Sequence, residues 1–215
     1  MNDPTHPSMA LRLREATQEA HTAAERTQFV RNLFKGTLPR DGYVRLIRSL
    51  HAVYATMEAG MRSHRDDPTV AAMHDPALER APALERDLEA LAGPAWRALP
   101  VVPAATEYAA HLAAISAQAP HLLVAHGYVR YLGDLSGGQM IGKRLQSMYG
   151  IGDDGTHFYR FEQVPDVEAR KHAFRGALDG LPLAGRAADD LVDEAKLGFD
   201  YARRIFEELD AGRNG

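Results

Sequence analysis

Apolar residues recur with the period of a helix along most of the chain. Between about 39 and 61 they return every three or four positions, which is typical of an amphipathic helix packed on a core. Pro39 and Asp41 mark its start. The apolar stripe consists of Tyr43, Leu46, Ile47, Leu50, Val53, Tyr54, Met57 and Met61.

Capping and helix-breaking residues divide the rest of the chain into further helices. Ser8 is an N-cap for a segment without glycine or proline, and Gly150 closes a long segment as a C-cap. Asp75-Pro76 predicts a helix start, and Gly93-Pro94 predicts its end. The predicted helices cover about 9–26, 39–61, 76–93, 120–149, 165–179 and 186–210.

Signals for strands and domain linkers are weak. No alternating run is bounded by hairpin turn residues, and only 156–163 reads as irregular or extended. A chain of 215 residues without a Pro/Gly/Ser-rich linker suits one domain. The sequence therefore predicts an all-α, single-domain helical bundle at 9–210, with flexible ends at 1–8 and 211–215.

Composition narrows the class of protein. The net charge of −4 gives no reason to expect nucleic acid or an anionic membrane surface. The absence of cysteine excludes disulfides, thiolate metal ligands and cysteine nucleophiles. The polar start, with Pro4 and Pro7, does not resemble a secretory leader, and no apolar run is long enough for a membrane anchor. We expect a soluble, cytoplasmic protein.

The run RYLGDLSGGQ at 130–139 places Gly133, Gly137 and Gly138 in a helical pattern, at a combined cost of about 3 kcal/mol relative to alanine. Two explanations account for such glycines: a bulky partner lies directly against the main chain, or another helix packs closely against it. The residues alone leave both explanations open. The same run contains the LSGGQ pentapeptide of ABC-type ATPases, but the chain has no P-loop, so a nucleotide site is not predicted.

His21 differs in its surroundings from the other nine histidines. Small residues flank it, and Glu25 follows at i+4, where a carboxylate can hold the imidazole of a metal ligand. No spacing singles out His111, and His126 fits a structural role. Because Glu-x-x-His and His-Glu-x-x-His patterns are absent, we predict no non-haem metal site.

The segment from Arg130 to Gly138 resembles the signature of haem oxygenases, and the segment from Leu13 to His21 resembles the proximal-ligand helix of that family. Similarity extends over about 11–209. The resemblance implies a haem oxygenase bundle with haem between a proximal helix and a glycine-kinked distal helix.

The resemblance also implies roles for particular residues. His21 would bind the haem iron with support from Glu25, and the backbone of Gly133 and Gly137 would lie over haem and O₂. Asp134 would be catalytic, its carboxylate holding the water chain that delivers protons. Contacts to the haem propionates would come from Arg14, Tyr128, Lys171 and Arg175.

The implied reaction is cleavage of haem b, which serves as substrate and cofactor, to biliverdin, CO and Fe²⁺. It requires O₂ and electrons from an external flavin reductase or ferredoxin, and suits a monomer that acquires iron from haem. Gln18 stands where the family often has lysine, and Ala202 where some relatives have a polar residue, which leaves the propionate contacts open. A haem carrier or sensor is the alternative. Thiaminase-like enzymes on the same bundle need a cysteine, which is absent.

Overall fold

The chain forms a helical bundle, and the part that the structure describes contains no strand. The structure is a computed structural model that describes residues 7–212, except for the side chain of Gln139. Most of the expected flexible ends lies outside these residues. The α-helices are α1 Met9–Glu25, α2 Gln28–Lys35, α3 Arg40–Ser63, α4 Pro68–Met73, α5 Ala81–Ala92, α6 Pro103–Gln118, α7 Leu123–Gly133, α8 Gln139–Tyr149, α9 Val167–Asp179 and α10 Arg186–Ala211.

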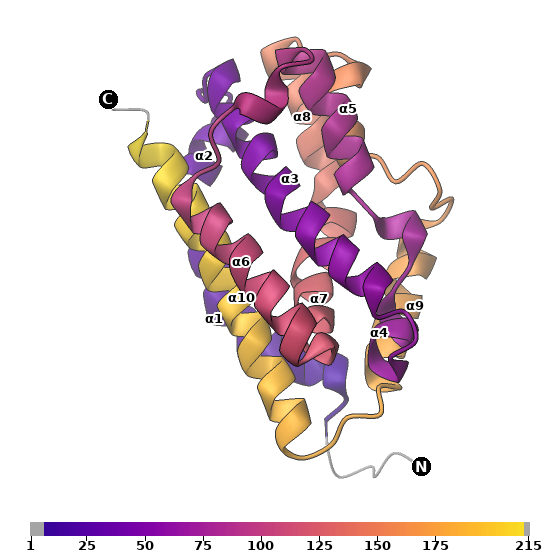
Figure 1. Cartoon of the computed structure of the whole chain (residues 1–215). Helices are drawn as coiled ribbons and strands as arrows, with labels where there is room; N and C mark the ends of the chain where they lie inside the picture. Colours follow the sequence, from indigo (N-terminus) through magenta and orange to yellow (C-terminus); the bar gives the residue numbers. More distant parts are fainter. Residues whose placement is uncertain (1–6, 213–215) are drawn as a thin grey trace.

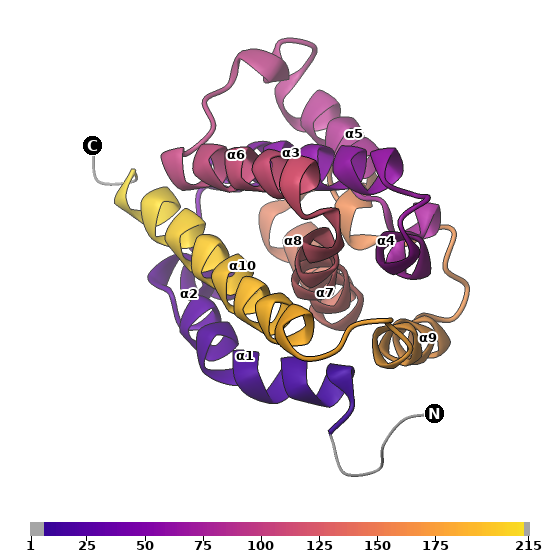
Figure 2. The same ribbon diagram turned by 60° about the horizontal axis from the view of Figure 1, so that its bottom comes forward.

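The long helices α3 and α10 organise the bundle. Figure 1 shows α3 running through it, and Figure 2 shows α6 alongside α3 and α10 between that pair and α1. Helix α10 also packs against α7, which lies near the centre of the view in Figure 2. Within the described residues, no helix combines the length and apolar character that crossing a bilayer requires.

The predicted apolar stripe of α3 is confirmed as core. Each of its eight side chains is 4% exposed or less. Burial of a large apolar side chain stabilises a fold by about 1.5–3 kcal/mol, so this face is a main source of the stability of the bundle. The N-cap at Ser8 is confirmed by its side-chain bond from the Leu11 N–H, and Gly150 adopts the left-handed conformation of a C-cap.

Three sequence predictions differ from the structure. Asp75 and Pro76 start only a single 3₁₀ turn, η1 (Pro76–Leu78), and α5 begins later at Ala81. The predicted helix at 120–149 is divided into a 3₁₀ turn, α7, an irregular helical turn and α8. Helices α2, α4 and α6 were not predicted. Helix α6 has an alanine-rich sequence with a weak apolar stripe, although Pro103 at its first position is a start signal.

The late start of α5 is explained by Glu58, a fully buried acid on α3. Its carboxylate accepts bonds from the backbone N–H groups of Arg80 (2.6 Å) and Ala81 (3.1 Å) and from the Tyr131 hydroxyl (3.3 Å). Glu79 leaves the helical conformation, and the N–H groups of Arg80 and Ala81 that follow it point to Glu58. Burial, opposed by these hydrogen bonds, raises the pKa of Glu58 to about 7.

This raised pKa makes stability depend on pH. Because the folded protein holds the Glu58 proton more tightly than the unfolded chain, protonation favours folding at low pH, and this contribution is lost as pH rises through about 7. In the wild type, loss of this proton lowers the unfolding free energy by about 2–3 kcal/mol between about pH 5 and pH 8. We expect Glu58→Gln to abolish this part of the pH dependence. Urea denaturation at both pH values measures it. The exposed control Glu89→Gln should keep the wild-type slope, and an unchanged slope in Glu58→Gln would contradict the assignment.

Candidate functional site

The glycine-rich run forms a π-helical turn between two α-helices. This turn, η4 (Asp134–Gly138), joins the end of α7 to the start of α8 (Figure 1). A π turn inside a helix is rare and occurs frequently at functional sites. The irregularity predicted from the glycines is therefore a change of helix type confined to five residues.

The glycines of this region fall into two groups. A Cβ on Gly133 or Gly137 would meet no heavy atom within 4 Å. A Cβ on Gly138 would lie 3.5 Å from the Tyr159 ring, and one on Gly142 would lie 3.0 Å from the Tyr159 Cβ. Packing against Tyr159 thus accounts for Gly142, whereas Gly138 is only in ordinary contact with the same ring. Gly133 and Gly137 leave bare backbone beside open space.

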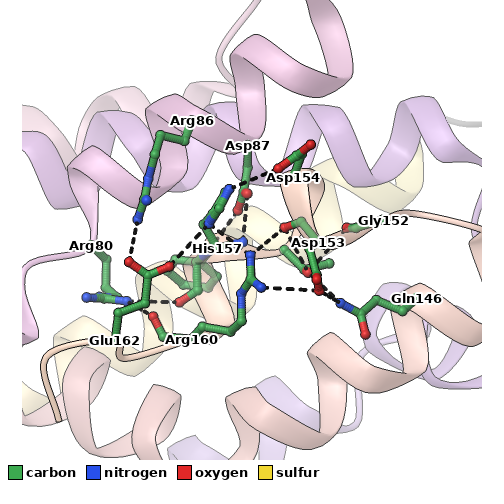
Figure 3. Close-up of polar contacts among 12 residues, drawn as sticks. Arg80, Arg86, Asp87, Gln146, Gly152, Asp153, Asp154, His157, Arg160 and Glu162 are labelled. Atoms are coloured by element: carbon green, nitrogen blue, oxygen red, sulfur yellow. Dashed lines mark hydrogen bonds and ion pairs between the residues drawn. The ribbon is translucent and has the colours of Figure 1, made fainter.

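A polar cluster fixes the segment that carries Tyr159 (Figure 3). Asp87 on α5 accepts bonds from the backbone N–H groups of His157 (2.7 Å) and Phe158 (2.8 Å), and Arg80 donates to the Arg160 carbonyl (2.7 Å). Burial raises the pKa of Asp87 to about 6, with these N–H groups acting in the opposite direction. The segment predicted as irregular is therefore firmly held against the back of the π turn.

Asp134 belongs to a hydrogen-bonded chain that reaches α3. The hydroxyl of Tyr54 donates to its carboxylate, and the Arg130 Nε donates to the Tyr54 hydroxyl oxygen (3.1 Å). Burial raises the pKa of Asp134 to about 6, against the charge of Arg130 and the Tyr54 bond. A carboxyl group with this pKa can accept and release a proton near neutral pH.

His21 lies on the outer part of α1 with a side chain 43% exposed. Its Nε2 is 3.6 Å from a Glu25 carboxylate oxygen, and its ring packs edge-on against Phe199 of α10 at 5.3 Å. The structure therefore places the predicted pair side by side and keeps the imidazole accessible.

The remaining predicted residues lie on α1 itself or on helices with residues that contact it. Tyr128 of α7 places its hydroxyl 3.4 Å from the Thr17 hydroxyl, one turn before His21. Lys171 lies on α9, which packs against α1, and pairs with Glu168 at 2.6 Å. Arg14 and Arg175 are exposed, and neither forms an ion pair with the described residues. No hydrogen bond or ion pair joins these four predicted propionate residues to one another within the described part of the chain.

Tyr54, Arg130 and Arg80 belong to the site but were not predicted as site residues. Tyr54 was placed in the apolar stripe of α3, where its ring is buried as expected, but its hydroxyl points to Asp134. The spacing of Arg130 and Asp134, four positions apart, was an available signal of a charged pair. The spacing could not predict how the two side chains interact, because the Tyr54 hydroxyl lies between them and bonds to both.

These features fit one kind of ligand. An accessible imidazole on α1, bare glycine backbone at the end of α7 and basic residues on α1 and α9 suit a flat, anionic group that contains iron. Such an arrangement is that of an all-α haem-binding protein.

The family model for heme oxygenase matches residues 7–208. The chain is 38% identical to heme oxygenase 1 of Synechocystis sp., over 94% of this chain and 85% of that protein. The crystal structure of Synechocystis heme oxygenase-1 in complex with heme superposes with a TM-score of 0.92 at 37% identity, covering 96% of this chain and 94% of that one. The structure of heme oxygenase from Leptospira interrogans superposes with a TM-score of 0.89 at 35% identity, covering 94% of this chain and 100% of that one.

The chain belongs to the haem oxygenase family, and haem degradation is its activity. The predicted fold class, family and enzyme class are thereby confirmed.

The two groups of glycines should respond oppositely to alanine. Gly142→Ala is expected to destabilise the protein by about 1–3 kcal/mol, because its Cβ overpacks against Tyr159. Gly133→Ala and Gly137→Ala meet no atoms and should leave the unfolding free energy unchanged or raise it by up to about 1 kcal/mol. Chemical denaturation of the haem-free variants measures both. Equal destabilisation by all three would contradict the division.

Proposed function

We propose that this chain cleaves haem b with O₂ to biliverdin, CO and Fe²⁺ at a site between α1 and the π turn. The observation that carries the proposal is the bare backbone of Gly133 and Gly137 next to Asp134, whose carboxylate is held by a buried tyrosine. Bound haem supplies the iron that activates O₂ and the porphyrin carbon that is oxidised. Without side chains at the two glycines, O₂ and the porphyrin edge can lie against the main chain.

His21 binds the iron through one ring nitrogen, and Glu25 holds the ring in orientation. The support is the exposure of the imidazole and the 3.6 Å separation between its Nε2 and the Glu25 carboxylate. A carboxylate partner fixes the orientation of a ligating imidazole and increases its basicity. Both effects favour iron binding by the neutral ring.

Cations of α1 and α9 would hold the haem propionates. Arg14 and Arg175 are exposed and have no ion-pair partner among the described residues, so both are available to carboxylates. Lys171 is already paired with Glu168, which is itself 80% exposed and can give way to a propionate. Tyr128 adds a hydroxyl from α7 near Thr17.

Asp134 delivers protons during oxygen activation through ordered water. The raised pKa of its carboxyl group, about 6, suits proton exchange near neutral pH. Tyr54 and Arg130 act as positioning residues, since each holds the next group in the chain of bonds.

Electrons come from a separate protein of the ferredoxin or flavin reductase type. A chain without cysteine cannot hold an iron–sulfur cluster by thiolates, which is consistent with an outside source of electrons. We propose further that the enzyme acts as a cytoplasmic monomer that acquires iron from haem.

Replacement of His21 tests the iron ligand. His21→Ala should lose the Soret band of imidazole-bound haem, and added imidazole should restore it, because free imidazole can occupy the space of the deleted ring. Absorption titration with haem measures both effects. His172→Ala, which removes an exposed histidine on α9, should behave as wild type. A wild-type spectrum in His21→Ala would assign the iron to another ligand.

Replacement of Asp134 separates an enzyme from a haem carrier. Asp134→Asn should bind haem with wild-type affinity and form biliverdin at least about 100-fold more slowly, since the amide cannot exchange the proton. Single-turnover absorption spectroscopy under O₂ and reductant follows product formation. The matched control Ser136→Ala, an exposed neighbour in the π turn, should keep full activity. Turnover of Asp134→Asn at the wild-type rate would refute the role, and a wild type that forms no biliverdin would indicate a carrier.

A further inference from the structure

A second cluster of metal-ligating side chains lies apart from His21, where three other helices meet. His111 on α6 and His126 on α7 both direct their Nε2 atoms at Oε1 of Glu194 on α10, at 2.5 and 2.7 Å. One ligating atom from each residue lies within 4.8 Å of the others. The proposed haem oxidation uses none of these three residues.

The cluster combines a buried core with an accessible edge. His126 is fully buried, whereas the side chains of Glu194 and His111 are 10% and 24% exposed. Both Nε2 atoms lie within hydrogen-bonding distance of the same carboxylate oxygen, so the three donor groups converge on one point at the junction of the helices.

The buried imidazole already has an outer partner of the kind found around metal sites. The Nδ1 of His126 lies 2.7 Å from the hydroxyl of Tyr108, whose ring stacks on Tyr201 at 4.6 Å. When Nε2 binds a metal, the ring proton resides on Nδ1 and can be donated to the Tyr108 oxygen. Such a partner fixes both the tautomer and the direction of a ligating histidine.

We propose that His111 Nε2, His126 Nε2 and Glu194 Oε1 form a binding site for a divalent transition-metal ion of the Zn²⁺ class. Two imidazoles and one carboxylate are a donor set that zinc takes with water in the fourth position. The partly exposed side of His111 gives that water, and the ion, a way in.

The site must adjust to accept the ion. Tetrahedral zinc with bonds of about 2.0–2.1 Å separates its ligand atoms by about 3.3 Å. The Glu194 oxygen must therefore move away from the Nε2 atoms of His111 and His126 by about 0.8 and about 0.6 Å, and the two Nε2 atoms, which lie within 4.8 Å of each other, must also settle at about 3.3 Å. The ion would replace hydrogen bonds between the same groups and would tie α6, α7 and α10 together.

Zinc titration of the full chain, with and without haem, tests the proposal. Isothermal titration calorimetry with zinc chloride should show one equivalent bound in both forms, which makes the result independent of the proposed haem chemistry. His111→Ala and Glu194→Gln should each weaken binding at least about tenfold. His126 is left intact because it is fully buried.

The control is His172→Ala, which removes an exposed histidine on α9 and should bind zinc like wild type. Zinc should also raise the melting temperature of wild type but not of His111→Ala, since only a bound ion stabilises the folded state. Absence of stoichiometric binding would show a purely hydrogen-bonded triad and overturn the proposal. Unchanged affinity in either His111→Ala or Glu194→Gln would overturn it as well.

Discussion

The contact between Tyr159 and the glycines behind the π turn is the constraint on which the candidate site depends. Tyr159 packs against Gly138 and lies so close to Gly142 that a side chain there would have to push it aside. Because this contact fixes the turn from one side, Gly133 and Gly137 can leave their backbone bare on another. A site made of main chain needs such support, since it has no side chains of its own to lock it.

Three buried acids connect this support to the rest of the bundle. Glu58 holds the start of α5, Asp87 holds the segment that carries Tyr159, and Asp134 closes the chain through Tyr54. Each has a raised pKa because it is buried, although hydrogen bonds and, at Asp87 and Asp134, nearby basic groups act in the opposite direction. Burial therefore raises the pKa at two structural anchors and at the residue that we propose as the proton donor.

Local sequence signals predicted most of the long helices, and the family resemblance supplied the candidate site residues. The period of α3, the cap at Ser8 and the glycine run are properties of neighbouring positions, and the structure confirms the helical elements that they indicated. The pairing of His21 with Glu25 follows from helix geometry in the same way.

Contacts between distant segments could not be predicted. Asp75 has the form of a helix start, but Glu58, on another helix, determines where α5 begins. Tyr54 belongs to an apolar stripe by its spacing, and only the position of α7 shows that its hydroxyl serves Asp134. The cluster of His111, His126 and Glu194 draws one residue from each of three helices, so the absence of a short motif said nothing about it.

The π turn also has a consequence for the chain beyond it. Such a turn holds one residue more than an α-helix would use over the same stretch, and one residue corresponds to a rotation of about 100° around the helix axis. The extra residue in 134–138 therefore sets which face of α8 turns towards the core. Deletion of one residue there would restore a continuous α-helix and rotate Gly142 away from Tyr159. The site would then be disrupted even if every side chain around it stayed the same. The geometry of the site therefore depends on the number of residues in the turn as well as on which side chains they carry.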